Sequence, residues 1–181
     1  MVSAFNAELS WKADYIYNQD DEPIGSLELG SATVSHGGCG PVAVYNAMQV
    51  LGKTDVSFED ILSYYEDNDG YILDGYLGTS VYTCISYFES QGYTVVATRD
   101  VVNSAEFARY ADVSILWCWF DTNSFPYLGA HFMAFEQIGT QGVYYNAYSG
   151  STDVYRYTGD CYDFLDHYGG SNAVLIMIFD N

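Results

Sequence analysis

Cys39, His131 and Asn146 follow one another along this sequence in an order that could perform nucleophilic catalysis. A cysteine attacks a carbonyl carbon as a thiolate, so it needs a base that takes its proton. The base in turn needs a third group that holds its tautomer. A thiol with an ordinary pKa of about 8.5 is only a few per cent ionised at neutral pH, which makes its surroundings decisive. The three residues therefore predict a nucleophile, a general base and an orienting group.

Cys39 stands directly before Gly40 and Pro41, and apolar residues at helical spacing continue to Gly52. Proline suits the first turn of a helix, because the N–H that it lacks would have no partner there. This pattern predicts that Cys39 begins a helix. Backbone N–H groups and the positive end of the helix dipole favour a thiolate at that position. The alternative is a buried cysteine selected only for its small apolar side chain.

His131 opens a predicted strand over 131–138, and Asn146 lies on the next strand, over 143–148. Between them, Thr140-Gln141-Gly142 predicts a hairpin turn. When two strands pair about this turn, residues whose numbers sum to roughly 280 lie opposite each other. His131 and Asn146 therefore come within reach of each other on adjacent strands. Each residue also has a simpler interpretation, as a buried strand histidine or as a polar residue near a turn.

Capping residues and hydrophobic periodicity predict the other elements. These are helices that begin after Ser57, Ser80 and Asn103, a short helix over 160–167, and strands over 93–98, 113–120 and 173–179. Helices come first and an antiparallel sheet follows, which is an α+β fold.

No internal repeat or linker divides the chain, so we expect a single domain over residues 1–181. Within it, residues 1–30 are predicted to form an extended N-terminal segment, and residues 36–179 are predicted to form the core.

The chain carries 24 acidic residues against five lysines and arginines, and its formal net charge is −19. This balance excludes nucleic acids and anionic membrane surfaces as partners. It would attract basic peptides or proteins, unless it serves only to keep the surface solvated. No apolar run reaches the roughly 18 residues of a membrane helix. Residues 1–17 lack the basic region and apolar core of a signal peptide. We therefore expect neither a membrane helix nor a signal peptide, and the localisation stays open.

The cysteines are widely spaced and predict neither a disulfide framework nor a metal site. A zinc site made of Cys39, His36, Cys161 and His167 would lack the closely paired ligands that such sites use. The acidic run before Gly70 does not match a calcium loop, because tyrosines would occupy its first and last ligand positions. We therefore predict no cofactor.

Four blocks of this sequence resemble successive blocks of the papain-like cysteine peptidases. They are Cys39-Gly40-Pro41-Val42-Ala43, Gly78-Thr79-Ser80, Gly129-Ala130-His131-Phe132-Met133-Ala134-Phe135 and Asn146-Ala147-Tyr148-Ser149-Gly150. The chain is most similar to the branch of bacteriocin-processing, double-glycine leader peptidases and to the stand-alone relatives of that branch, over residues 36–179.

The resemblance implies a papain-like fold and hydrolysis of a peptide bond through a thioester. It implies Cys39 as the nucleophile, His131 as the general base and acid, and Asn146 as the orienting residue. The substrate would be a peptide or protein with small residues before the cleaved bond, and the acidic surface would favour a basic chain. A papain-like module that only binds a peptide is the alternative, as is an amidase or transpeptidase that acts on a non-peptide amide.

The sequence departs from the family pattern at two points. The branch usually has aspartate before proline at the third position, whereas Asn146 precedes Ala147 here. Family members also carry a glutamine about six residues before the cysteine, and its amide helps to form the oxyanion hole. Thr33 occupies that position, and Gln19, twenty residues before Cys39, could reach the site only if the chain folds back.

The sequence offers several tentative donors to the oxyanion in place of that glutamine. They are Gln19, Thr33, Ser35, His36, Gly38 and the backbone N–H of Cys39. The loss of one oxyanion donor typically reduces the rate by about 10²- to 10³-fold, so the identity of this group bears directly on activity.

Overall fold

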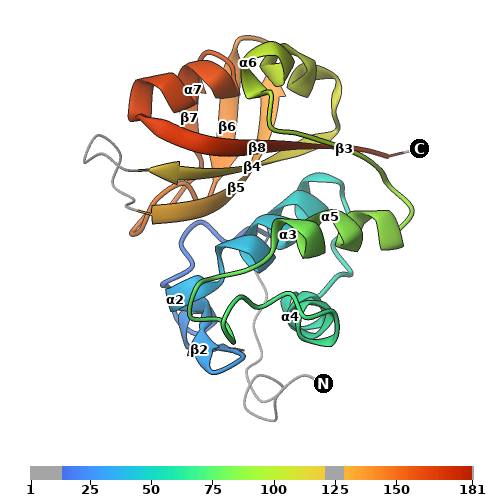
Figure 1. Cartoon of the computed structure of the whole chain (residues 1–181), viewed down its shortest axis with the longest axis vertical. Helices are drawn as coiled ribbons and strands as arrows, with labels where there is room; N and C mark the ends of the chain where they lie inside the picture. Colours follow the sequence, from blue (N-terminus) through green and yellow to red (C-terminus); the bar gives the residue numbers. More distant parts are fainter. Residues whose placement is uncertain (1–13, 121–128, 181) are drawn as a thin grey trace.

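A six-stranded antiparallel sheet lies between two groups of helices (Figure 1). The computed structural model describes residues 14–120 and 129–180. Along the sheet the strands follow the order β3, β8, β4, β5, β6 and β7. Their bounds are β3 Thr94–Thr98, β8 Gly170–Phe179, β4 Val113–Phe120, β5 Gly129–Ile138, β6 Gln141–Tyr145 and β7 Tyr155–Thr158. The predicted α+β fold, with N-terminal helices packed on a later antiparallel sheet, is confirmed.

The N-terminal helices cover one face of the sheet. They are α2 (Val34–Gly37), α3 (Cys39–Val50), α4 (Phe58–Asp67) and α5 (Val81–Ser90). Helix α3 has no charged residue and is buried from Cys39 to Gln49, because it is enclosed by the sheet and by the other helices. Ser57 and Ser80 accept hydrogen bonds from the backbone of the first turns of α4 and α5, so both predicted caps are confirmed.

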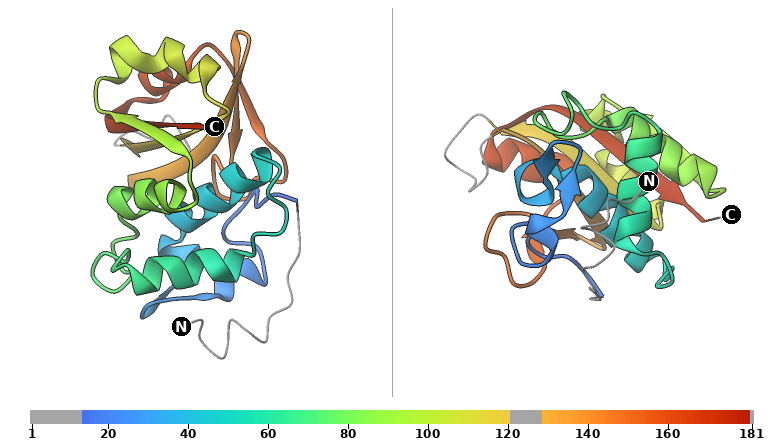
Figure 2. Two further views of the ribbon diagram at one scale, coloured as in Figure 1. Left: turned by 90° about the vertical axis from the view of Figure 1, so that its right-hand side faces the viewer. Right: turned by 90° about the horizontal axis from the view of Figure 1, so that it is seen from below.

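The second group of helices covers the opposite face, as the turned views in Figure 2 show. It consists of α6 (Val101–Ser104), η2 (Ala105–Tyr110) and α7 (Cys161–Tyr168). Helix α7 has a capping box between Asp160 and Asp163. The prediction that Asn103 caps a helix is wrong: this residue lies inside α6, and its side chain donates to Asp100.

The alternation of side chains along β5 builds two separate cores. Phe132 and Ala134 pack with α3 on one face, whereas Met133 and Phe135 pack with α7 on the other. The hairpin that joins β5 to β6 is tighter than predicted, because Ile138 pairs with Gln141 directly around the turn. Strand β7, which the sequence did not predict, pairs with β6 at the edge of the sheet.

The segment before α3 is anchored to it by buried hydrogen bonds. Its elements are η1 (Ile24–Ser26), β1 (Glu28–Leu29) and β2 (Ala32–Thr33). The backbone of Ile16 donates to and accepts from the side chain of Asn46, with both distances at 2.8 Å. This pairing lays the chain along α3. Residues 1–13 of the predicted extended segment lie outside the described residues.

No helix among the described residues is long and apolar enough to cross a membrane.

Candidate active site

Close packing requires the glycines on both sides of Cys39. A Cβ atom on Gly38 would lie 2.7 Å from the backbone oxygen of Val34, in the helix before it. A Cβ atom on Gly40 would lie 2.0 Å from Oγ1 of Thr79. The two glycines therefore allow the start of α3 to approach α2 and the chain before α5. The side chain of Cys39 is 7% exposed at this position.

Burial affects the pKa of Cys39 more than its position at the start of the helix does. The backbone N–H groups of Phe132, Gly40 and Cys39 itself lower the pKa of the thiol, because they favour the thiolate. Desolvation is larger and acts in the opposite direction, so burial raises the pKa of the Cys39 thiol to about 11. At neutral pH the thiol of Cys39 is therefore neutral.

His131 is fully buried on β5, next to the residue that contacts Cys39. Its Nε2 atom donates to the backbone oxygen of Asn146 at 2.7 Å, which leaves the lone pair on Nδ1. Burial lowers the pKa of His131 to about 4, against the opposing effects of the Asn146 carbonyl and the negative charge of Asp20. Cys39 and Phe132 line the same cavity, so the start of α3 lies against the strand that carries His131.

Asn146 contacts His131 through its backbone, while its side chain pairs with Gln19. The backbone N–H of Gln19 donates to Asn146 Oδ1, and Asn146 Nδ2 donates to Gln19 Oε1, both at 3.1 Å. Asn146 adopts a left-handed backbone with φ of 53°, a conformation that asparagine tolerates better than most residues. This turn directs its carbonyl toward the imidazole, and the side chain fixes the N-terminal segment to the site.

Gln19 does fold back to the site, but the structure engages its amide elsewhere. Its Nε2 donates to the backbone oxygens of Val34 at 3.2 Å and Ser35 at 3.1 Å. Both hydrogens of this amide are thus bound to the helix that precedes Cys39. In this arrangement Gln19 braces α2 against Asn146 and has no further hydrogen to donate to an oxyanion.

Replacement of Gln19 by leucine tests this bracing role. We expect the unfolding free energy to fall by about 1–3 kcal/mol, because buried carbonyls and the Asn146 amide lose their partners. If Gln19 were instead an oxyanion donor, its loss would lower kcat by about 10²- to 10³-fold and leave the stability unchanged. Urea denaturation and steady-state kinetics separate the two results. Gln49→Leu is the matched control, since Gln49 is 8% exposed and its Nε2 has no hydrogen-bond partner among the described residues.

The other tentative oxyanion donors differ in their surroundings. Thr33 is exposed on β2 and does not line the cavities at Cys39. His36 lines the larger cavity, and its Nε2 lies 3.1 Å from the carbonyl oxygen of Tyr76. The N–H of Gly38 donates to Val34. The backbone N–H of Cys39, at the first residue of α3, is therefore the main-chain donor best placed beside the sulfur.

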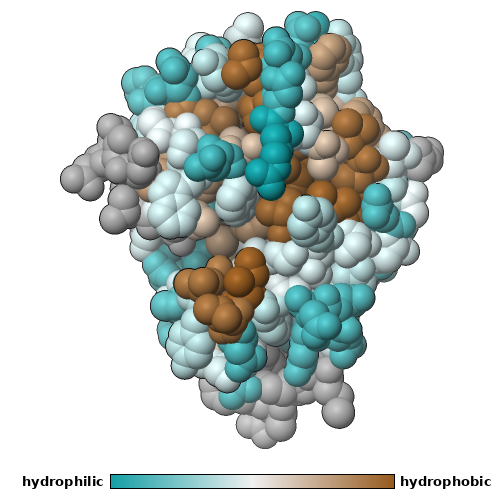
Figure 3. Space-filling model, in the orientation of Figure 1, coloured by the Kyte–Doolittle hydropathy of each residue, from teal (hydrophilic) through white to brown (hydrophobic). Residues whose placement is uncertain are grey.

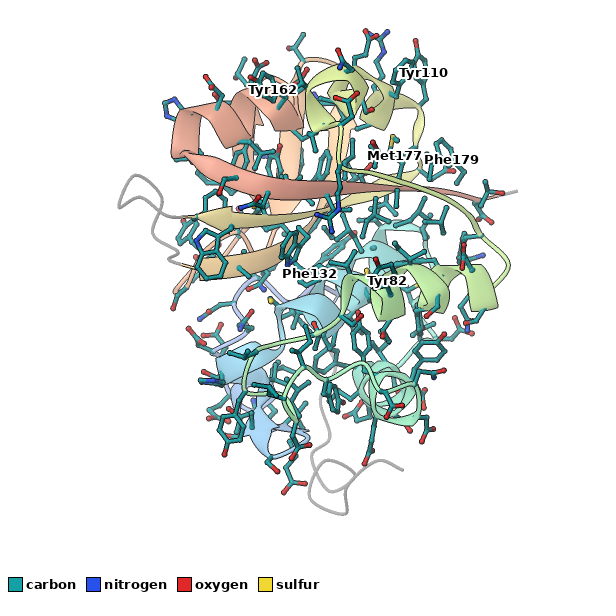
Figure 4. All side chains as sticks on the ribbon, viewed as in Figure 1. Tyr82, Tyr110, Phe132, Tyr162, Met177 and Phe179 are labelled. Atoms are coloured by element: carbon teal, nitrogen blue, oxygen red, sulfur yellow. The ribbon has the colours of Figure 1, made fainter. Side chains whose placement is uncertain are left out.

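Two cavities meet at Cys39. The larger, of about 580 Å³, is lined by polar and aromatic residues that include Asp20, Ser35, Ser149 and Trp119. The smaller, of about 240 Å³, is mostly apolar and is lined by residues that include Tyr82, Trp117, Phe132 and Val174. In Figure 4, Phe132 comes from β5 of the sheet, and Tyr82 comes from α5 below it. A cleft with the thiol between two cavities can hold an extended chain on both sides of the sulfur.

Within the described part of the chain, no group of three His, Cys, Asp or Glu residues could hold a metal ion.

Burial of neutral His131 makes stability depend on pH. Above its ordinary pKa of about 6.5 the histidine is neutral in both states. Between pH 6.5 and the folded value of about 4, only the unfolded chain binds the proton, so stability falls as the pH falls. We expect this group to remove about 3 kcal/mol of unfolding free energy over that range, with no further loss below it. Denaturation at pH 7 and 4 should show this loss in the native protein and not in His131→Gln.

No family model matches this sequence, and no curated protein is significantly similar to it. The fold resembles that of the peptidase domain of Streptococcus ComA, a bifunctional ABC transporter involved in quorum sensing. The TM-score is 0.54 at 12% identity, over 79% of this chain and 91% of that domain. The Pseudomonas avirulence protein AvrPphB gives a TM-score of 0.37 at 11% identity, over 79% of this chain and 90% of that one. The chain has the papain-like peptidase fold, which confirms the resemblance at the level of fold.

Proposed function

We propose that this protein is a cysteine peptidase that cleaves a peptide bond through a thioester on Cys39. The observation that carries the proposal is that Cys39, at the start of α3, and Phe132, the residue that follows His131, line the same cavity. The hydrogen bond from His131 to the carbonyl oxygen of Asn146 supports the proposal, because it would hold the histidine in the tautomer that a base needs. The two cavities beside the sulfur offer room for the substrate chain.

The proposed reaction starts from a neutral thiol and a neutral imidazole, because burial disfavours both charged forms. Nδ1 of His131 takes the thiol proton as the sulfur attacks the carbonyl carbon. The backbone N–H of Cys39 donates to the oxyanion. The C–N bond then breaks, and the imidazolium returns its proton to the leaving amine. A water molecule, deprotonated by His131, finally hydrolyses the thioester.

Asn146 acts in this scheme through its carbonyl, which stabilises the imidazolium and keeps Nδ1 available to the thiol. A neutral backbone acceptor thereby supplies the orienting hydrogen bond. The side chain of Asn146 holds the carbonyl in place through its pair of hydrogen bonds with Gln19.

A pool of randomised peptides tests the proposal. Mass spectrometry should detect new termini after incubation with the native protein, and products formed in H₂¹⁸O should carry one ¹⁸O in the new carboxylate. Transfer to added amines instead of water would indicate a transpeptidase. If no peptide in the pool is cleaved although peptides bind to the folded protein, the peptidase proposal is wrong and a peptide-binding module is the better description.

A further inference from the structure

Asp20 is held in one orientation at the wall of the larger cavity. Ser35 Oγ donates to its Oδ1 at 2.8 Å, and Ser149 Oγ donates to its Oδ2 at 2.5 Å. The two serines come from α2 and from the loop after β6, and all three side chains line the cavity that reaches Cys39. Each carboxylate oxygen keeps lone-pair capacity beyond its serine partner. Asp20 is therefore a fixed negative charge, and solvent reaches it from the cavity.

The rest of this cavity also suits a positive charge. Trp119, which is 46% exposed, and Tyr76, which is 58% exposed, present aromatic rings at its walls. Aromatic faces attract cations through the ring quadrupole. No lysine or arginine is among the described residues that line it, whereas Arg99 lines the smaller cavity. The two sides of Cys39 therefore differ in charge.

The smaller cavity and its surroundings form the apolar side of the cleft. Ile72 and Leu77 line it, and both are exposed residues of the loop between α4 and α5. Figure 3 shows a hydrophobic patch over this loop on the lower part of the face shown. A cationic side chain would lose hydration there without gaining a carboxylate partner, so the larger cavity is the favourable place for it.

We propose that the larger cavity binds an arginine or lysine side chain of the substrate peptide, and that Asp20 is the residue that determines this specificity. The inference rests on the proposed peptidase function and names the class of substrate for the same site. A guanidinium or ammonium group bound here donates to the carboxylate that Ser35 and Ser149 orient, and its hydrocarbon stem contacts the aromatic walls. The formal net charge of −19 draws such peptides toward the protein from a distance.

Asp20 has a second possible effect that the experiment must separate. Its negative charge raises the pKa of His131, so its loss could slow the reaction of every substrate. Recognition of a cation has a different signature, because it changes only the cleavage of peptides that carry the cation.

The test uses peptide sets built on a sequence cleaved from the pool, with arginine, citrulline or glutamate placed in turn at each position beside the cleaved bond. Citrulline keeps the shape of arginine without its charge. At one position, the native protein should cleave the arginine peptide about 10- to 100-fold better in kcat/KM than the citrulline peptide. Asp20→Asn should reduce this ratio to about 1, because it lowers kcat/KM for the arginine peptide much more than for the citrulline peptide. Asp21→Asn is the matched control, because Asp21 lines a different cavity.

Two results would overturn the inference. In one, Asp20→Asn slows the arginine and citrulline peptides by the same factor, which would make Asp20 a positioning residue for His131. In the other, the native protein has no preference for arginine at any position. If no peptide is cleaved at all, binding of fluorescent peptides to the Cys39→Ala variant decides the matter. If Cys39→Ala binds the arginine peptide more tightly than the citrulline peptide, and Asp20→Asn removes this preference, the larger cavity binds a cation although the peptidase proposal fails. If the two peptides bind equally, both the peptidase proposal and the inference about Asp20 are wrong.

Discussion

Replacement of Cys39 by alanine is expected to lower kcat for peptide hydrolysis by roughly 10⁴- to 10⁶-fold. The variant loses the only atom that forms the thioester, so the residual rate reflects substrate binding and the remaining hydrogen-bond donors alone. The side chain is small, and its removal leaves a cavity of about one sulfur atom. We therefore expect the unfolding free energy to change by no more than about 1–2 kcal/mol. Product formation over long incubations and urea denaturation measure the two effects.

Cys161 provides the matched control for this substitution. It is also a buried cysteine at the first residue of a helix, and burial raises its pKa to about 12. It lies in the core on the opposite face of the sheet, away from the cleft. Cys161→Ala should cost a similar amount of stability and leave kcat/KM within a factor of about two. Equal activity of the native protein and Cys39→Ala would reject the proposed nucleophile.

Replacement of His131 by alanine should have the second largest effect, a loss of about 10³-fold or more in kcat. Without the imidazole, the thiol loses its proposed proton acceptor, and the pKa of about 11 leaves about one thiol in 10⁴ ionised at pH 7. The residual rate of the variant should therefore rise about tenfold per pH unit between pH 7 and 10. A pH–rate profile of the variant against that of the native protein measures this change.

His36 is the control for the histidine. It is exposed, lines the larger cavity and contacts the carbonyl oxygen of Tyr76. If His131 is the base, His36→Ala should retain activity within a few-fold. The assignment would be wrong if His36→Ala abolished cleavage while His131→Ala remained active, because the accessible histidine would then act on the thiol.

Local patterns were sufficient for most elements of this fold. Apolar spacing and Pro41 placed the start of α3 at Cys39, and hydroxyl caps placed α4 and α5 correctly. Strand periodicity predicted β4, β5 and β8, because each has apolar residues that must face a core. Three errors of detail depend on neighbours that a local pattern does not contain: the cap at Asn103, the exact hairpin turn, and the placement of Asn146 on a strand, because β6 ends at Tyr145.

The order of cysteine, histidine and asparagine predicts a catalytic triad, but it does not predict the atoms through which His131 and Asn146 contact each other. Asn146 contacts His131 by its carbonyl, since its side chain is paired with Gln19 across more than a hundred residues of sequence. No spacing rule predicts such a contact, because it depends on how the N-terminal segment is laid along α3.

Tertiary structure also decided the charge state of the site. Residue type and helix position favoured a thiolate at Cys39, yet desolvation in the folded core has the larger effect, so that Cys39 is a neutral thiol and His131 a neutral imidazole at neutral pH. It likewise brought Asp20 to the cavity wall through serines from two distant segments. The sequence carries the chemistry in the types and order of its residues, whereas burial and long-range hydrogen bonds, which exist only in the folded chain, determine which protons and charges face the cleft.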